Sequence, residues 1–149
     1  LTEVQALAVA TPFGLPRRTS IGFDQNRLAM LIAILERKAG IELGGHDVFL
    51  NAVGGLRLSE PAADLAVALS LASTHRAAAV GRDIIAFGEL GLTGEVRRVS
   101  KVEARIEEAR RLGFKQILLP EGHRSRIVDA PDLLWVTSVA AAVDRVGLA

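Results

Sequence analysis

The sequence lacks cysteine and tyrosine, and only 4% of its residues are aromatic. Without cysteine it cannot form a disulfide, a thiolate zinc site or a cysteine nucleophile. The patterns GxxxxGKS/T, GxGxxG and GxSxG are also missing, which excludes a P-loop for ATP, a dinucleotide-binding turn and a serine-hydrolase elbow within these residues. The longest apolar run, from Leu28 to Leu35, is far shorter than the roughly 20 residues that span a bilayer, so we expect no membrane partner.

Charge and composition indicate one folded domain without a strong bulk charge. Half of the 149 residues are hydrophobic, and 18 Lys and Arg against 17 Asp and Glu give a net charge of +1. Any affinity for nucleic acid must therefore come from local clustering of cations. The three histidines (His46, His75 and His123) have no ligand spacing, so no metal site is predicted. The chain starts at Leu1 without a signal peptide, and we expect a fragment of a longer cytoplasmic protein.

The first half of the chain alternates predicted strands and helices. Residues 2–10 alternate polar and apolar side chains, and residues 17–23 are predicted to return beside them as an antiparallel strand. Asp24 is the predicted N-cap of a helix that ends before Gly40. Residues 47–53 form the next predicted strand. A buried helix follows over 59–75, with Ser59 as its predicted N-cap.

The second half continues the alternation. Short strands are predicted at 84–87, 116–119 and 133–136, and glycines at 88, 91 and 94 favour a hairpin whose second arm is 95–99. Residues 100–112 predict a helix with a capping box of Ser100 and Glu103. Ser138 is the predicted cap of a last helix that ends near Val146. These elements predict an α/β class with mixed strand directions.

Two long motifs resemble a known family. The run DVFLNAVGGLRLSEPAADLA (47–66) and the run FGELGLTGEVRRV (87–99), followed by GFKQILLP (113–120), are similar to the C-terminal Lon-protease-like domain of the bacterial DNA repair family RadA, also called Sms. FGLPRR (13–18) and DQNRL (24–28) fit the same family. The resemblance implies that 1–149 is a single domain with the Lon proteolytic fold. That fold is a two-layer mixed sheet with helices, similar to the second domain of ribosomal protein S5.

The same resemblance implies a pseudoprotease. Active Lon proteases use a Ser–Lys dyad, and the two dyad positions fall on Ala62 and Glu103 in this chain. A methyl group cannot attack a carbonyl, so we expect no catalytic residue. An active protease that uses Ser59 as a relocated nucleophile is the enzymatic alternative. Lys101, about 200° around the helix from Glu103, is expected to point away from the dyad positions.

The family further implies assembly and DNA contact. The longer protein is expected to carry a zinc finger and a RecA-like ATPase core, so Zn, Mg and ATP belong to those parts and no cofactor is expected in this chain. It would act as a hexameric, ATP-driven, DNA-dependent motor for branch migration in homologous recombination, on single-stranded or branched DNA and beside a RecA-type recombinase. A homo-oligomeric ring of this domain would extend the channel of the motor.

Local charge supports the DNA role. Between residues 97 and 115 seven basic side chains stand against three acidic ones. Phosphate contacts need clustered cations and no particular sequence, and the scarcity of aromatic residues argues against base stacking. The DNA-binding candidates are Arg17, Arg18, Arg57, Arg97, Arg98, Lys101 and Arg105. Two alternatives remain: a solvated helix face with pairs such as Glu107–Arg111, and a structural collar that oligomerises without contacting DNA.

Overall fold

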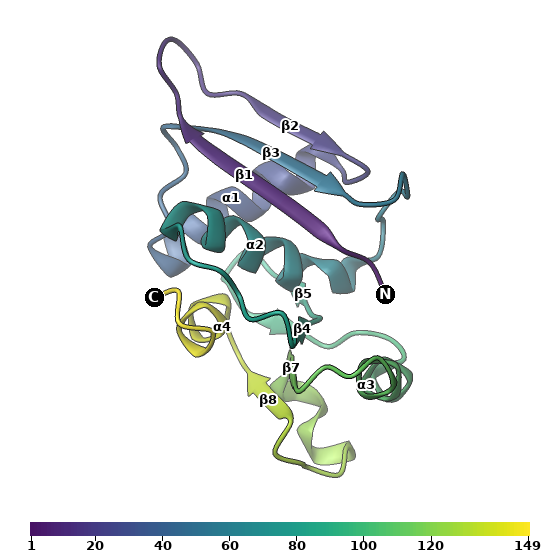
Figure 1. Cartoon of the computed structure of the whole chain (residues 1–149). Helices are drawn as coiled ribbons and strands as arrows, with labels where there is room; N and C mark the ends of the chain where they lie inside the picture. Colours follow the sequence, from purple (N-terminus) through teal and green to yellow (C-terminus); the bar gives the residue numbers. More distant parts are fainter.

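A computed structural model describes all residues, 1–149, and gives an α/β fold. Figure 1 shows one sheet at the top, two helices beneath it, and a second sheet with the remaining helices below. The elements in chain order are β1 (Val4–Ala10), β2 (Arg18–Ile21), α1 (Gln25–Ala39), β3 (His46–Ala52), the 3₁₀ turn η1 (Pro61–Ala63), α2 (Asp64–Arg76), β4 (Ile84–Ala86), β5 (Glu89–Leu90), β6 (Val96–Arg97), α3 (Val102–Arg111), β7 (Gln116–Pro120), the 3₁₀ segment η2 (Glu121–Arg126), β8 (Leu133–Val136) and α4 (Val139–Arg145). The predicted α/β class with mixed strand directions is confirmed, although the strands are divided among three sheets.

The first sheet has the order β1–β3–β2. β1 runs antiparallel to β3, with Leu7 opposite Phe49, whereas β2 runs parallel to β3, with Thr19 opposite Phe49. The predicted antiparallel pairing of residues 17–23 with 2–10 is therefore wrong, because β3 lies between the two strands. The guanidinium of Arg18 donates to the carbonyls of Leu43 and His46, which holds β2 against β3.

Two helices cover the inner face of this sheet. Asp24 caps α1 as predicted, since its carboxylate accepts a hydrogen bond of 2.9 Å from the backbone N–H of Arg27. Gly40 ends the helix in the left-handed conformation, at φ 68°, which glycine adopts without steric cost. α2 is buried over most of its circumference, as its apolar sequence predicts. Both helices belong to a core of 24 buried residues.

The second sheet is parallel, with the order β4–β7–β8. Side chains of β7 alternate between two cores, because successive residues of a strand point to opposite faces. Leu118 joins the large core beside α2 and α4. Ile117 and Leu119 instead join a smaller core of seven residues with Ile106 and Ala109 of α3. α3 thus packs on one face of this sheet, and the large core covers the other.

Three helix starts test the predicted caps. Ser138 caps α4, as predicted, by accepting from the N–H of Ala141 at 3.1 Å. The capping box of Ser100 and Glu103 is wrong: α3 begins after Lys101, whose left-handed backbone (φ 57°) places Ser100 outside the first turn. The predicted cap at Ser59 is also wrong, because the N–H of Ala62 is satisfied by the carboxylate of Glu60 at 3.3 Å.

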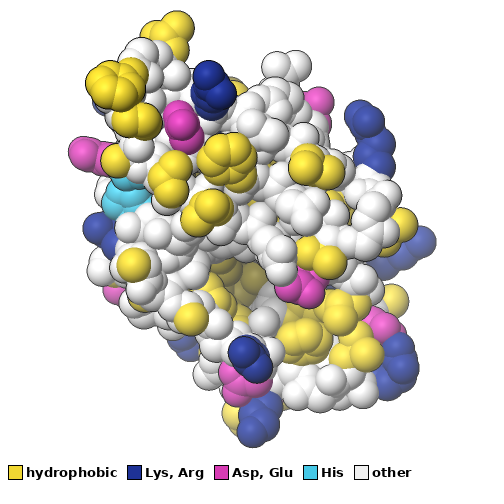
Figure 2. Space-filling view, turned by 45° about the horizontal axis from the view of Figure 1, so that its top comes forward, with side chains coloured by type: hydrophobic (Ala, Val, Ile, Leu, Met, Phe, Trp, Pro, Cys, Tyr) yellow, Lys and Arg dark blue, Asp and Glu magenta, His cyan; other side chains and the backbone are white.

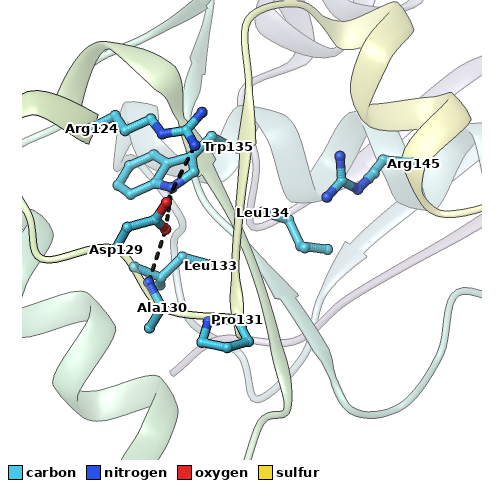
Figure 3. A pocket seen from close by; sticks show the side chains of 8 residues that line it. All are labelled: Arg124, Asp129, Ala130, Pro131, Leu133, Leu134, Trp135 and Arg145. Atoms are coloured by element: carbon cyan, nitrogen blue, oxygen red, sulfur yellow. Dashed lines mark hydrogen bonds and ion pairs between the residues drawn. The ribbon is translucent and has the colours of Figure 1, made fainter.

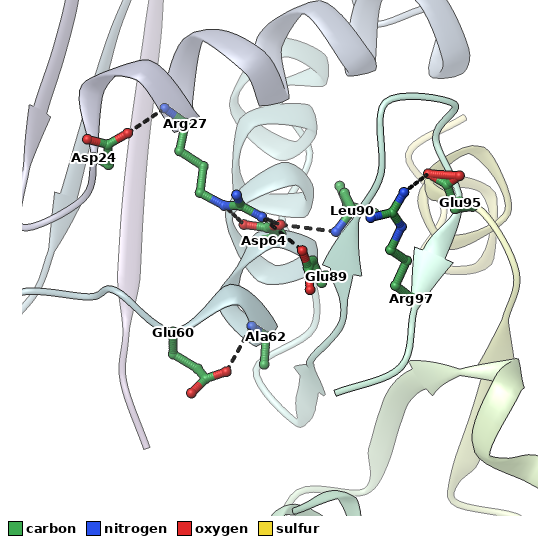
Figure 4. A network of polar contacts seen from close by, with 9 residues as sticks. All are labelled: Asp24, Arg27, Glu60, Ala62, Asp64, Glu89, Leu90, Glu95 and Arg97. Atoms are coloured by element: carbon green, nitrogen blue, oxygen red, sulfur yellow. Dashed lines mark hydrogen bonds and ion pairs between the residues drawn. The ribbon is translucent and has the colours of Figure 1, made fainter. Parts of the chain in front are cut away.

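One buried carboxylate connects three elements. Asp64, at the start of α2, is 0% exposed and is the only charged residue among the buried ones. It accepts hydrogen bonds from the guanidinium of Arg27 in α1 and from the backbone N–H of Leu90 in β5, the latter at 3.0 Å (Figure 4). The hydrogen bond with Asp64 raises the pKa of Arg27, and Glu89 lies 3.9 Å from the same guanidinium. A buried charge is tolerated only when it is paired and hydrogen-bonded, so Asp64 sets the positions of α1 and β5 relative to α2.

We predict that Arg27→Met lowers the free energy of unfolding by about 2 to 4 kcal/mol, because it leaves the Asp64 carboxylate buried without its cation. Urea denaturation measures this loss. Arg111→Met is the matched control, since it removes the exposed pair with Glu108 and should cost less than about 1 kcal/mol. Equal losses for the two variants would contradict the structural role of the Arg27–Asp64 ion pair.

Candidate nucleic-acid interface

A groove with a volume of about 440 Å³ lies where the two halves of the molecule meet. Its walls come from the start of β1, η1, β4 and α3, and eleven of its sixteen lining residues are hydrophobic. Figure 2 shows a hollow lined by hydrophobic side chains on the face below the first sheet. Gly88 keeps the backbone close here: its N–H donates to the carbonyl of Ala62 at 2.9 Å, and a Cβ on Gly88 would lie 2.6 Å from a methyl group of Val96.

The structure places the two dyad positions differently. Ala62 is buried at the groove, but Glu103 is exposed on α3 and does not line it. Lys101 does line the groove, which corrects the expectation that it points away. The helical angle of 100° per residue does not apply to Lys101, because this residue precedes the first turn of α3 in a left-handed conformation. Lys101, and not residue 103, is therefore the residue after the hairpin that shares this groove with Ala62.

No nucleophile is paired with a base in this groove. The hydroxyl that lines it belongs to Thr2, which makes no side-chain hydrogen bond to a basic group. Ser59 is exposed, lies outside the lining residues and has no hydrogen-bond partner for its hydroxyl. A nucleophilic hydroxyl needs an adjacent base to be activated at neutral pH. The geometry offers no such pair, either at the dyad positions or at the alternative Ser59.

Unpaired cations lie beside the groove, at the start of α3. Arg98 and Lys101 are exposed and have no carboxylate within 4.0 Å. Arg97 lies 3.8 Å from Glu95, and Arg105 both pairs with Glu60 at 3.4 Å and donates to the carbonyl of Ser100 at 2.8 Å. Unpaired exposed cations are free to contact phosphate, whereas the partners of the other two compete for it.

The other candidates lie at two further places. Arg57 is exposed and unpaired, in the loop that precedes Glu60. Because Glu60 pairs with Arg105, the end of this loop lies beside α3. Arg17 and Arg18 lie at the opposite end of the first sheet, where β2 and β3 begin. Arg18 is engaged with backbone carbonyls and serves the fold. The structure thus brings Arg57, Arg97, Arg98, Lys101 and Arg105 to one side and separates Arg17 and Arg18 from them.

The second half of α3 carries paired arginines. Arg110 forms a two-pronged pair with Asp132 at 2.7 and 2.9 Å, and Arg111 pairs with Glu108 at 2.6 Å. The predicted partner of Arg111, Glu107, is not the one used. These contacts raise the pKa of both arginines and lower that of Asp132 and Glu108, because each hydrogen bond stabilises the charged forms. This part of α3 is a solvated face with ion pairs.

His123 is a residue of this region that sequence reasoning missed. Its Nε2 accepts a hydrogen bond of 3.0 Å from the backbone N–H of Val99, directly before the unpaired cations. Burial lowers the pKa of His123, and the nearby charge of Arg98 lowers it further. The neutral imidazole therefore ties η2 to the segment that carries Arg98 and Lys101. No motif in the sequence signals this contact, since residues 99 and 123 are far apart in the chain.

A second cavity, of about 530 Å³, lies beside β8 (Figure 3). The indole N–H of Trp135 donates to the carboxylate of Asp129 at 2.9 Å, and Arg124 lies 3.3 Å from the same carboxylate. The hydrogen bond with Trp135 is the largest cause of the lowered pKa of Asp129. In Figure 3 the polar groups around Asp129 form hydrogen bonds with one another, and these bonds hold the loop before β8 in place.

The grouping of acidic and histidine side chains and the length of the helices bear on metal and membrane binding. No group of three or more His, Asp or Glu side chains comes together in a way that could hold a metal ion. None of the helices is both long enough and apolar enough to cross a bilayer.

Comparison with known proteins gives a family and several relatives. Residues 5–123 match the family model described as subunit ChlI of Mg-chelatase. The chain is 47% identical over 121 residues to the DNA repair protein RadA of Halalkalibacterium halodurans, covering 81% of this chain and 26% of that protein. It is 42% identical over 144 residues to the RadA of Aquifex aeolicus, covering 97% and 32%. The RadA of Streptococcus pneumoniae is 41% identical over 148 residues, covering 98% and 35%. The chain thus spans 26–35% of the length of these relatives.

We predict that stability falls with acid through His123. Because the folded state lowers the pKa of His123 below its unfolded value of about 6.5, the contribution of the neutral ring is complete above that value and is lost as the pH falls through the folded pKa. His123→Gln keeps an oxygen that can accept from Val99 but does not titrate. Between about pH 7.5 and about pH 5, urea denaturation should show a larger loss for the wild type than for the variant.

The two proteins differ only at residue 123, so the comparison isolates this side chain. Identical pH dependence of the two proteins would show that the His123–Val99 contact does not contribute.

Proposed function

Because this chain belongs to the family described as subunit ChlI of Mg-chelatase and is homologous over most of its length to proteins named DNA repair protein RadA, we propose that it is a non-proteolytic, Lon-like domain that contacts DNA and assembles into a ring within a DNA repair protein. The longer protein acts in the cytoplasm as an ATP-driven motor for branch migration in homologous recombination, with a RecA-type recombinase as its partner. Zn, Mg and ATP belong to its other parts. The hexameric ring of this domain extends the channel of the motor.

The observation that carries the DNA role is the pair of unpaired cations at the start of α3. Arg98 and Lys101, which precede α3, have no carboxylate partner, while Arg110 and Arg111 at the end of α3 are both paired with carboxylates. A phosphate backbone is attracted by cations that are exposed and free of internal partners. Arg57 adds a third free cation on the same side. DNA therefore runs past the start of α3, with Arg97 and Arg105 able to exchange their carboxylates for phosphate.

The absence of a nucleophile–base pair supports the non-proteolytic role. Ala62 lies in the groove where the resemblance places a serine, and the one hydroxyl that lines the groove, that of Thr2, makes no hydrogen bond to Lys101. An active protease that uses Ser59 is the enzymatic alternative. A structural collar without DNA contact is the second alternative, and the ion pairs on the second half of α3 favour it over DNA contact for that part of the surface.

We predict that Arg98→Glu combined with Lys101→Glu weakens DNA binding at least about tenfold at low salt and lowers the slope of log affinity against log salt by about 1 for each lost phosphate contact. Fluorescence anisotropy over a salt series, with labelled single-stranded and branched DNA, measures both quantities. The matched control is Arg37→Glu with Lys38→Glu, which changes the net charge equally on exposed cations at the end of α1.

The control variant should bind DNA nearly as the wild type does. Binding that is insensitive to salt, or equally weakened in the two double variants, would contradict a phosphate contact at the start of α3. Undetectable binding by the wild type, together with self-association, would instead support the structural collar.

We predict no hydrolysis of casein or of a fluorogenic peptide above a buffer blank, because neither Ala62 nor Ser59 is a nucleophile paired with a base. Mass spectrometry after treatment with a serine-directed inhibitor should show no adduct. Hydrolysis that Ser59→Ala abolishes would establish the protease alternative, and hydrolysis that Thr2→Val abolishes would place the nucleophile in the groove.

A further inference from the structure

The loop between β1 and β2, residues 11–17, displays two large apolar side chains to solvent. Phe13 is 91% exposed and Leu15 is 89% exposed. In Figure 1 this loop extends at the top of the molecule, beyond the end of the first sheet. Exposed apolar residues are common singly, but a phenylalanine and a leucine two residues apart on a projecting loop form a small apolar patch.

The base of this loop is held in place. The carboxylate of Asp47 accepts from the hydroxyl of Thr11 at 3.0 Å and from the backbone N–H of Arg17 at 2.8 Å. These two hydrogen bonds join both ends of the loop to the start of β3. A proline follows Thr11 and another precedes Arg17, which reduces the conformational freedom of the backbone between them. A loop that is ordered in advance loses little entropy when its tip binds.

A matching apolar recess lies at the other end of β1. The groove beside Ala62 continues into a neighbouring cavity, distinct from the one beside β8. The groove and this neighbouring cavity share six lining residues, among them Val4 and Ala86. Val4 begins β1, whereas the loop follows Ala10, so the length of a seven-residue strand, about 20 Å, separates the recess from the loop. The loop of a given chain therefore does not reach its own groove.

Arg82, Lys101 and Arg105 also line the recess, and beside them one pair of exposed charges on the two surfaces is complementary. Arg17 adjoins the loop tip, and its guanidinium has no carboxylate within 4.0 Å. Glu3 lines the neighbouring cavity, and no cation lies within 4.0 Å of its carboxylate. The carboxylate accepts one hydrogen bond, from the side chain of Gln5. Both side chains are exposed, and each lacks an ion-pair partner within its own chain.

We infer that the loop tip with Phe13 and Leu15 inserts into the groove of a second copy of this chain, where Arg17 pairs with Glu3. The contact joins two different surfaces, so an open assembly always ends in one free loop and one free groove, and a ring forms when the rotation between copies brings these two ends together. This inference rests on the assembly part of the proposed function and names the surfaces that it uses. An aromatic anchor in an apolar pocket is the usual centre of such an interface.

The test uses two variants of the 149-residue chain and their mixture. Phe13→Asp with Leu15→Asp removes the apolar tip, and Ala104→Trp narrows the groove from an exposed position on α3. Light scattering over a concentration series should show the wild type above the monomer mass and each variant as a monomer, with the dissociation constant raised at least about tenfold. Circular dichroism checks that both variants are folded.

The mixture gives the decisive outcome. The groove variant keeps its loop and the loop variant keeps its groove, so a 1:1 mixture should form a dimer and stop there. Controls are Val128→Asp, which changes an apolar residue that is 90% exposed elsewhere, and Ala140→Trp, on the exposed side of α4. Both controls should assemble as the wild type does. Arg17→Glu should weaken assembly, and adding Glu3→Arg should restore it.

Four results would overturn the inference, and they are distinguishable. An assembly that the loop and groove variants leave intact would place the interface elsewhere while the proposed ring remains. A mixture that stays monomeric would exclude loop-into-groove contact. A wild type that is monomeric at every concentration would overturn both this contact and the proposed assembly. If the loop variant lost DNA affinity without any change in mass, the apolar tip would be a DNA contact instead.

Discussion

The Asp64 carboxylate is the constraint on which the arrangement of the two halves depends. It is fully removed from water, and its hydrogen-bond partners come from α1 and from β5. An unpaired charge in such a place is costly, so only one placement of these elements satisfies it. Because Asp64 begins α2, the same ion pair also fixes the short turn that ends at Ala63 and carries Ala62 into the groove. The position of Ala62 in the groove therefore depends on an ion pair whose two side chains do not line the groove.

The groove lies where the two hydrophobic cores approach each other. Ala62 and Phe87 belong to the smaller core, which packs α3 against the second sheet, while the larger core holds the first sheet to α1 and α2. The left-handed residue Lys101 turns the chain just before α3 and directs one cation into the groove. The packing on both sides of Lys101 offsets the free-energy cost of its strained backbone. The result is an apolar recess with cations at its edge, in which no side-chain hydroxyl is hydrogen-bonded to a base.

Local signals were predicted well where one short stretch of chain decides the outcome. Asp24 and Ser138 cap their helices because a side-chain oxygen needs only the N–H groups of the next turn, and Gly40 ends α1 because glycine tolerates positive φ. The predicted cap at Ser59 was wrong because Glu60 competes for the same N–H. The capping box at Ser100 was wrong because the backbone of Lys101 leaves the expected conformation. The pairing of β1 with β2 was wrong because β3, which comes later in the chain, lies between them.

The sequence by itself determined the class of the fold, the positions of most helices and strands and the family motifs, since all of these follow from residue identity and near spacing. Only the tertiary structure decided which cations are free. Arg110 and Arg98 are equally basic in sequence, but Asp132 neutralises the first and nothing neutralises the second. It also decided that Lys101 enters the groove and Glu103 does not, and that the apolar loop and the apolar recess lie at opposite ends of β1. Pairing and direction depend on residues that are distant in the chain, and folding alone brings them together.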